Sequence, residues 1–173
     1  MKRIRVIPAL LLNKKGLVKS VRFRDYKYVG DPMNAVRIFN EKEVDELAII
    51  DIDAKRDKRS PDVARIASIV SEAFMPIAYG GGISKVEEAE GILLNGAEKV
   101  IINKAAVTDS GLISEIARRF GTQSVVISID FKKTFFGSVN VFTDNGKTNT
   151  HLDPVTFARQ VEQAGAGEIL LNS

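Results

Sequence analysis

The chain contains no cysteine and only one histidine, His151, among its 173 residues. The absence of cysteine excludes disulfides and thiolate chemistry, and it suits a reducing cytosol. A single histidine excludes a histidine-rich metal site, so we expect His151 in a solvated loop. We therefore expect a cytoplasmic protein with neither a metal ion nor a cofactor.

Long apolar runs and a strong charge of one sign are also missing. No apolar run approaches the ~20 residues that cross a membrane, and the first residues lack the layout of a signal peptide. The 25 basic residues are scattered among 22 acidic ones, which leaves a net charge of +3. These patterns predict no membrane and no nucleic-acid partner.

The composition that remains is typical of one globular domain over residues 1–173, since 45% of the residues are hydrophobic and 27% are charged. Apolar runs of strand length alternate with helical patterns. Nearly continuous apolar runs are typical of parallel strands that are covered on both faces. Six strands are expected, at residues 4–12, 47–53, 77–79, 100–103, 124–130 and 168–171.

Three predicted helices share one start signal, in which a capping side chain precedes a proline. The pairs are Asp31-Pro32, Ser60-Pro61 and Asp153-Pro154, and the first two helices are expected to end near residues 43 and 73. Two further helices are expected at 84–95 and 110–120. Residues 13–19 predict a loop with a small hairpin, and residues 134–150 predict a second hairpin around an Asp-Asn-Gly turn at 144–146.

The alternation of strands and helices predicts an α/β fold with a parallel sheet and right-handed crossovers. Two architectures compete: an open doubly wound sheet, and a (βα)8 TIM barrel of which this chain holds about six strands. Residues 44–50 resemble 167–171, and residues 12–15 resemble 130–133, so the likeness recurs after four units. Because a four-unit repeat implies an eight-unit whole, it favours the incomplete barrel.

A glycine cluster ends the third predicted strand. Gly80, Gly81 and Gly82 are followed by Ser84 and Glu87, which have the spacing of a capping box. Three glycines let the backbone approach a ligand closely, and a helix start presents unpaired N–H groups. The stretch predicts either a phosphate cradle or a tight turn without a ligand.

Polar residues gather at the predicted carboxyl ends of the strands, where ligands bind in parallel α/β folds. Asp51, Asn103, Lys104 and Asp130 stand there. Asp130 follows an apolar strand, where an acid is costly without a partner, so it is either functional or a structural acid that caps a loop. Asn103 and Lys104 either close the phosphate site or form a turn into a helix.

Charged residues begin four of the predicted strands: Arg5, Glu46, Lys99 and Glu168. In a barrel these starts converge on the bottom face, where the four side chains form either an ion-pair plug or a polar gate. Two loops that follow strands are also charged. The run 55–59 and Lys19 are each interpreted as solvated, with a lid over a phosphorylated ligand as the alternative.

Together these residues resemble the HisF family, the cyclase subunit of imidazole glycerol phosphate synthase. The similarity runs over essentially the whole chain. The motifs that carry it are Asp-Glu-Leu at 45–47, Tyr-Gly-Gly-Gly-Ile at 79–83, Asn-Gly-Ala-Glu-Lys-Val at 95–100, Ile-Asp at 129–130 and Gly-Ala-Gly-Glu-Ile-Leu-Leu at 165–171.

The resemblance implies a barrel of the ribulose-phosphate-binding type that receives ammonia from a HisH-like glutaminase at its bottom face. It implies that Asp130 is one of two catalytic aspartates. We also expect Lys19 to be catalytic, and Asp51 to line the substrate pocket. Two further sets follow from the resemblance: an ammonia gate of Arg5, Glu46, Lys99 and Glu168, and a phosphate site of Gly81, Gly82, Asn103 and Lys104, where the family has threonine at position 104.

Two departures from the family pattern change the expected function. The second catalytic aspartate belongs at the end of the first strand, where Leu11 and Leu12 stand. The leucine side chain can neither donate nor accept a proton, so we expect cyclase chemistry that needs two carboxylates to be severely impaired. The second phosphate site of the family also lies after strands six to eight, which this chain lacks.

The sequences at 7–12, 28–32 and 51–54 look like a paralogous branch that is encoded with bacterial surface-polysaccharide genes and assists the amidation of acidic sugars. We therefore expect a HisF-like subunit of a glutamine amidotransferase system, with a phosphorylated small molecule or sugar as ligand. The alternatives are a genuine cyclase of histidine biosynthesis and a non-catalytic half-barrel scaffold. Unclosed strand edges also predict a homo-oligomer that completes the barrel.

Overall fold

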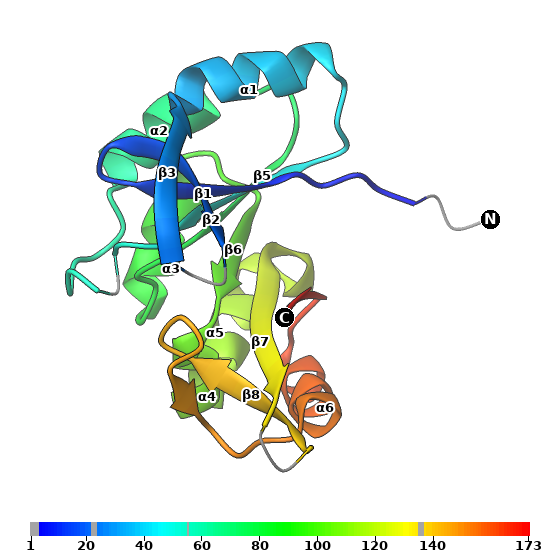
Figure 1. Ribbon diagram of the computed structural model, residues 1–173. Coiled ribbons are helices and arrows are strands. Elements are labelled where there is room, and N and C mark those ends of the chain that lie inside the picture. Colours follow the sequence, from blue (N-terminus) through cyan, green and yellow to red (C-terminus); the bar gives the residue numbers. More distant parts are fainter. Residues whose placement is uncertain (1–3, 22–23, 55, 135–136) are drawn as a thin grey trace. The chain divides into compact units, whose positions relative to one another are not determined.

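The computed structural model describes residues 4–21, 24–54, 56–134 and 137–173. It has an α/β fold with a largely parallel sheet (Figure 1). The chain divides into two compact units, one of Met1–Ile83 with Glu87–Val100 and one of Ser84–Val86 with Ile101–Ser173. Strand β6 (Lys99–Ile102) and helix α3 (Val86–Leu94) are divided between them.

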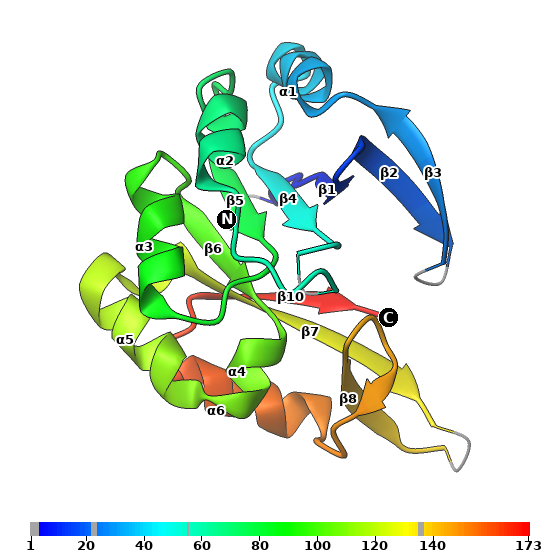
Figure 2. The same ribbon diagram turned by 90° about the vertical axis from the view of Figure 1, so that its left-hand side faces the viewer.

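The first unit is built on strands β1 (Ala9–Asn13), β4 (Leu47–Asp51) and β5 (Ile77–Gly80), which pair in parallel in that order. A hairpin of β2 (Gly16–Val21) and β3 (Arg24–Gly30) extends antiparallel from β1. Helices α1 (Pro32–Glu41) and α2 (Val63–Val70) precede β4 and β5. Figure 2 shows α2 and α3 along one side of β4 and β5, with the hairpin extending away from them.

The second unit is built on the long strand β7 (Val125–Lys133), which pairs in parallel with β10 (Glu168–Asn172). Beyond Asp130, β7 pairs antiparallel with β8 (Val139–Thr143), which in turn pairs with β9 (Thr148–Asn149). Helices α5 (Ser110–Phe120) and α6 (Pro154–Ala164) lie side by side against β7 (Figure 2). The short elements α4 (Lys104–Thr108) and η1 (Thr122–Ser124) flank α5.

Apolar side chains from the predicted strands and helices form the core of each unit. In the first unit Leu47, Ile66 and Ile77 are at most 2% exposed. In the second, Ile116 and Ile127 are fully buried. Burying one such side chain contributes about 2 kcal/mol. None of the helices among the described residues combines the length and the apolar character that spanning a membrane requires.

The predicted count of six strands is wrong, because the described residues contain ten. All six predicted strands are present, and the additional four form the two hairpins. Within the described residues neither unit closes its strands into a ring. The β2–β3 hairpin is much longer than the small one expected at 13–19. Its polar side chains hide the strand pattern, since most of β3 is exposed.

The first predicted strand is too long at its start. Residues 4–8 are not in a strand, and Ile4 is 89% exposed. Pro8 has no N–H to donate, and the ladder with β4 begins only at Ala9. An apolar run alone therefore did not mark the strand boundary.

Helix starts were predicted with mixed success. The Asp31 and Asp153 side chains accept N–H groups in the first turns of α1 and α6, which confirms both predicted caps. Ser60-Pro61 does not cap α2. Instead Asp62 accepts the Arg65 N–H, so the helix starts later than predicted. The Asp-Asn-Gly turn at 144–146 is present, with all three residues at positive φ.

The two units repeat one order of elements. A strand is followed by a hairpin, an Asp-Pro-capped helix and a second strand that pairs in parallel with the first, as β1–β2–β3–α1–β4 and as β7–β8–β9–α6–β10. The likeness between 44–50 and 167–171 aligns Glu46 with Glu168 and therefore Ile50 with Asn172. Since Leu11 is the register partner of Ile50 and Asp130 that of Asn172, the register makes Leu11 correspond to Asp130, one residue before the Leu12 that the likeness of 12–15 to 130–133 aligns with it.

Candidate functional site

The glycine loop after β5 lies against the end of β4 in the first unit. Gly81 and Gly82 have φ values of 121° and 77°, which favour glycine. A Cβ at Gly81 would come 2.4 Å from the Asp51 carbonyl oxygen, and one at Gly82 would come 2.9 Å from the Arg59 carbonyl oxygen. Within the described chain, the N–H groups of Gly81 and Gly82 donate no hydrogen bond to the protein. The glycine loop is therefore packed closely against Asp51 and Arg59, while its amide groups remain available as donors.

Asp51 is the centre of a buried polar network beneath this loop. Its Oδ1 accepts the N–H groups of Asp53 and Ala54, both at 3.0 Å. Its Oδ2 accepts the Arg59 guanidinium at 2.6 Å and is 3.5 Å from the hydroxyl of Tyr79. Burial and the Asp51 charge raise the pKa of Tyr79, which keeps this hydroxyl protonated.

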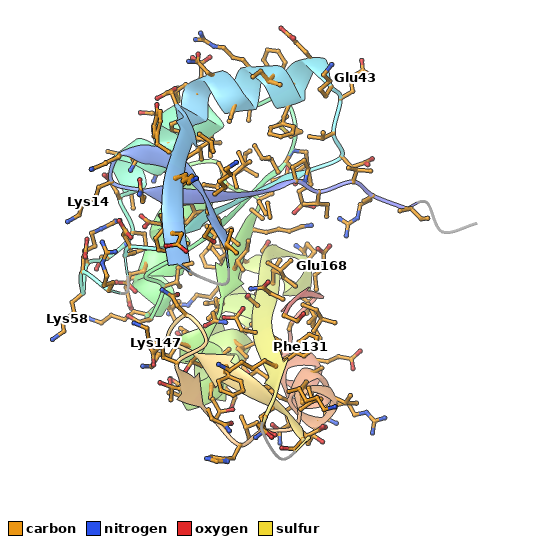
Figure 3. The ribbon with its side chains drawn as sticks, viewed as in Figure 1. Lys14, Glu43, Lys58, Phe131, Lys147 and Glu168 are labelled. Carbon is orange, nitrogen blue, oxygen red and sulfur yellow. The ribbon has the colours of Figure 1, made fainter. Side chains whose placement is uncertain are left out.

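Arg59 was missed as a structural residue because it ends the run 55–59, which was interpreted as solvated. Its side chain is only 27% exposed. The rest of the run fits the solvated interpretation better: Arg56 is exposed beside Asp57, and Lys58 projects outward (Figure 3). Lys55 lies outside the described residues. A buried carboxylate at Asp51 needs a cation, and that requirement is the signal that could have identified Arg59.

A buried ion cluster joins three of the four predicted gate residues. The Glu46 carboxylate accepts Lys99 Nζ at 2.6 Å and Arg5 Nη1 at 3.2 Å, both on Oε2. Glu46 is 3% exposed and Lys99 is 8% exposed. Glu168, the fourth residue, belongs to the second unit and is half-buried at the start of β10. Two cations on one buried carboxylate offset the cost of removing that charge from water.

In the second unit Asp130 lies between two amides. Its Oδ1 accepts Asn172 Nδ2 at 3.1 Å, and its Oδ2 accepts Asn103 Nδ2 at 3.3 Å. Asn103 also donates to the carbonyl of Ser128 at 2.9 Å. Burial raises the pKa of Asp130, and the two amide hydrogen bonds oppose the shift only partly. The carboxyl group is therefore easier to protonate than a solvent-exposed aspartate.

The Lys104 side chain forms an ion pair with Asp144, an acid that the sequence analysis did not identify. Its Nζ contacts both oxygens of Asp144, at 2.9 and 2.7 Å. Asp144 stands in the turn after β8 and also accepts the Thr148 hydroxyl. The bond ties α4 to the β8–β9 hairpin. Lys104 is thus not held as a free phosphate ligand beside Asn103.

The remaining predicted residue, Lys19, is exposed in the middle of β2, where its register partner is Lys27. It belongs to the first unit and Asp130 to the second. His151 is exposed in the loop before α6, in the solvated loop position predicted for it. The described residues contain no group of three or more His, Cys, Asp or Glu side chains that could hold a metal ion.

The chain matches a family described as histidine biosynthesis protein over residues 5–173. The chain belongs to this family. The match supports the TIM-barrel class that the internal repeat favoured, and the relatives confirm the predicted resemblance to HisF.

Three relatives illustrate the range. A Pseudomonas aeruginosa protein, provisionally named imidazole glycerol phosphate synthase subunit hisF2, is 56% identical over all of this chain and 69% of its own length. A Vibrio vulnificus protein, provisionally named subunit hisF3, is 51% identical over 99% of this chain and 66% of its own. Imidazole glycerol phosphate synthase subunit HisF of Chlorobaculum parvum is 41% identical over 98% and 67%. The chain thus spans about two thirds of these relatives.

Within this HisF-like chain, strand register decides which leucine replaces the expected second aspartate. Leu11 pairs with Ile50 and corresponds to Asp130, whereas Leu12 pairs with Asp51 and is 1% exposed. Leu11 is half-buried, as Asp130 is. The end of β1 therefore presents an apolar side chain at the position where the end of β7 presents a carboxylate.

Proposed function

We propose that this chain is part of a HisF-like subunit of a glutamine amidotransferase system. The subunit accepts ammonia from a HisH-like glutaminase and passes it on for sugar amidation in the synthesis of surface polysaccharide. Residues 1–173 belong to one barrel domain of a cytoplasmic protein. Its ligand is a phosphorylated small molecule or sugar.

The observation that carries this proposal is that only one of the two expected acids, at the ends of β1 and β7, is present. Asp130 has amide partners and a raised pKa, but its counterpart Leu11 cannot take or give a proton. Cyclase chemistry with one carboxylate as acid and another as base lacks half of its groups. Residual roles for Asp130 and Lys19 are positioning a ligand and moving a single proton.

The ion cluster of Arg5, Glu46 and Lys99 supports the transfer of ammonia. It combines two cations with one carboxylate, so an uncharged NH3 molecule meets both hydrogen-bond donors and an acceptor there. Opening the Lys99–Glu46 contact exposes donors and acceptors that can replace the hydrogen bonds of NH3 to water. Glu168 is assigned the same role in the second unit. In this family's barrel such strand starts form the bottom face, where the glutaminase would dock.

The glycine loop supports a phosphorylated ligand. Among the described residues, the Gly81 and Gly82 N–H groups have no acceptor, and backbone amides of this kind bind phosphate oxygens. Asn103 adds an amide in the second unit, whereas Lys104 contributes to phosphate binding only if Asp144 releases it. We assign these residues to ligand binding on that basis.

The alternative is a genuine cyclase subunit of histidine biosynthesis, which the names of the relatives favour. Ammonia-dependent turnover of the histidine precursor that yields imidazole glycerol phosphate separates the two. We expect the protein to be at least 10²-fold slower than a two-aspartate HisF, because general acid–base catalysis contributes about that much. The Leu11→Asp variant is expected to regain part of the activity. Turnover equal to that of a two-aspartate enzyme would overturn the sugar-amidation proposal.

The scaffold alternative is favoured by one observation. On β10 the apolar side chains of Ile169 and Leu171 are 38% and 61% exposed. Apolar side chains exposed on a strand favour a contact with another chain, here a second copy. Analytical ultracentrifugation of the 173-residue chain should therefore show a dimer or larger assembly. A monodisperse monomer would contradict completion by a second copy.

A further inference from the structure

The sequence suggested Asp51 as a residue of the substrate pocket, but its carboxylate has little capacity left for a ligand. Oδ1 accepts two backbone N–H groups, and Oδ2 accepts Arg59 and faces Tyr79. Asp51 is 4% exposed and Tyr79 is 2% exposed. A carboxylate with its acceptor positions filled by the protein serves to hold those groups in place.

The groups that Asp51 holds belong to the segment after β4. The two N–H groups fix the turn at residues 53 and 54, and the ion pair fixes Arg59 at the far end of the same segment. A backbone bond from the Arg59 N–H to the Ala54 carbonyl, 3.0 Å long, joins the two ends. Asp51 thus holds the two ends of this segment together at three points, and its described residues, 52–54 and 56–59, are called the 52–59 loop.

The closed loop is the surface on which the glycines lie. The Asp51 carbonyl lies below Gly81. The Arg59 carbonyl and the Ala54 Cβ lie below Gly82, at 2.9 and 3.1 Å from the point that a Cβ on this glycine would occupy. These contacts leave no room for a Cβ at either glycine. The path of Gly81 and Gly82 is therefore determined by the position of the 52–59 loop.

We propose that Asp51 is a positioning residue that, through Arg59, holds the 52–59 loop and so fixes the backbone of Gly81 and Gly82 as an anion-binding surface. The anion rests on the proposed function, whereas the positioning does not depend on it. The proposal predicts that removing Asp51 changes the anion affinity in the direction opposite to simple electrostatics. Removing a negative charge near an anion site should strengthen binding by electrostatics alone, but removing Asp51 weakens it, because the amides lose their arrangement.

The test uses the 15N-labelled 173-residue chain, with inorganic phosphate as the probe. Backbone order parameters of Gly81 and Gly82 are measured by 15N relaxation, and phosphate is titrated against the amide shifts. In the unaltered protein we expect order parameters near the rigid value of about 0.85. In Asp51→Asn and Arg59→Gln they should fall toward about 0.6, and phosphate affinity should fall about tenfold.

Lys58→Gln is the matched control for Arg59→Gln, since it removes one positive charge from an exposed, outward-projecting position of the same loop. It should leave the order parameters unchanged. If Asp51→Asn or Arg59→Gln does not fold, Arg59→Lys keeps the charge but loses the planar donor geometry, and it should loosen the glycines by a smaller amount.

The outcomes separate the two claims. Rigid glycines in Asp51→Asn and Arg59→Lys would overturn the positioning role, and so would tighter phosphate binding in Asp51→Asn. Absence of phosphate binding in the unaltered protein would overturn the assigned anion site. The relaxation data would still decide what Asp51 does.

Discussion

The two units treat their acidic side chains differently. In the first, the buried carboxylates are paired with cations: Glu46 contacts Lys99 and Arg5, and Asp51 contacts Arg59. In the second, Asp130 has the neutral amides of Asn103 and Asn172. Burial raises the pKa of Asp130, and its two amide partners offset this shift only in part. The same arrangement of elements thus supports ion-paired acids in one unit and an amide-bound acid in the other.

The largest effect is expected from breaking a buried pair. Lys99→Met leaves the Glu46 charge buried with Arg5 as its remaining partner, and should lower the free energy of unfolding by about 3 kcal/mol. Urea denaturation followed by circular dichroism measures this change. Lys104→Met is the control, because its pair with Asp144 is partly exposed and should cost at most about 1 kcal/mol. Equal losses would contradict the distinction between the two kinds of pair.

Rebuilding the second unit's polar pair in the first unit tests their correspondence. Leu11→Asp places an unpartnered carboxylate at a half-buried position and should cost about 2 kcal/mol. Ile50→Asn supplies the amide that Asn172 provides for Asp130, so the double variant should regain about 1 kcal/mol over the sum of the single changes. Strictly additive losses in a double-mutant cycle would show that the two positions do not meet as their counterparts do.

The two Asp-Pro caps should respond alike. Asp31→Ala and Asp153→Ala each remove an acceptor for N–H groups in a first helical turn, which costs about 1 kcal/mol. Thermal unfolding should therefore show similar decreases in Tm for the two variants. If the Tm of one variant does not decrease, the helix concerned is stabilised by packing and not by its cap.

The smallest and most pH-dependent effect is expected at Asp130. Its folded pKa is raised by burial, so the stability linked to this group is fully present below its unfolded pKa and is lost as the pH rises through the folded value. Asp130→Asn should therefore be more stable than the unaltered protein at pH ~7, and the difference should vanish below pH ~4. Urea titrations at several pH values measure it. A difference that grows on acidification would contradict the raised pKa.

Local signals allowed much of the fold to be predicted from the sequence. The Asp-Pro caps, the Asp-Asn-Gly turn and the apolar strands depend on neighbours in the chain, and these predictions were confirmed. The errors arose where distant partners decide. Residues 4–8 have an apolar strand pattern, yet β4 pairs only from Ala9. Ser60-Pro61 resembles a helix start, yet Asp62 provides the cap.

In the candidate site, too, features set by neighbouring residues could be predicted and those set by distant partners could not. The acids themselves could be identified from their positions after apolar strands, and Asp130 is indeed half-buried beside Asn103. Their partners could not be identified, because Arg59 lies in a charged run and Asp144 in a turn, and only folding brings them to Asp51 and Lys104. The assignment of these residues to catalysis, phosphate and ammonia stays a prediction.

The pairing of β7 has a consequence for how much the hairpin after it can vary. Up to Asp130 the strand is held in parallel by β10, and from Asp130 onward it is held by β8. Among the described residues of β7, Asp130 alone belongs to both ladders. Insertions or exchanges in the β8–β9 hairpin therefore act on the chain beyond this point, while the parallel ladder keeps the carboxylate in register. A hairpin of different length or sequence can therefore be grafted here without moving the acid.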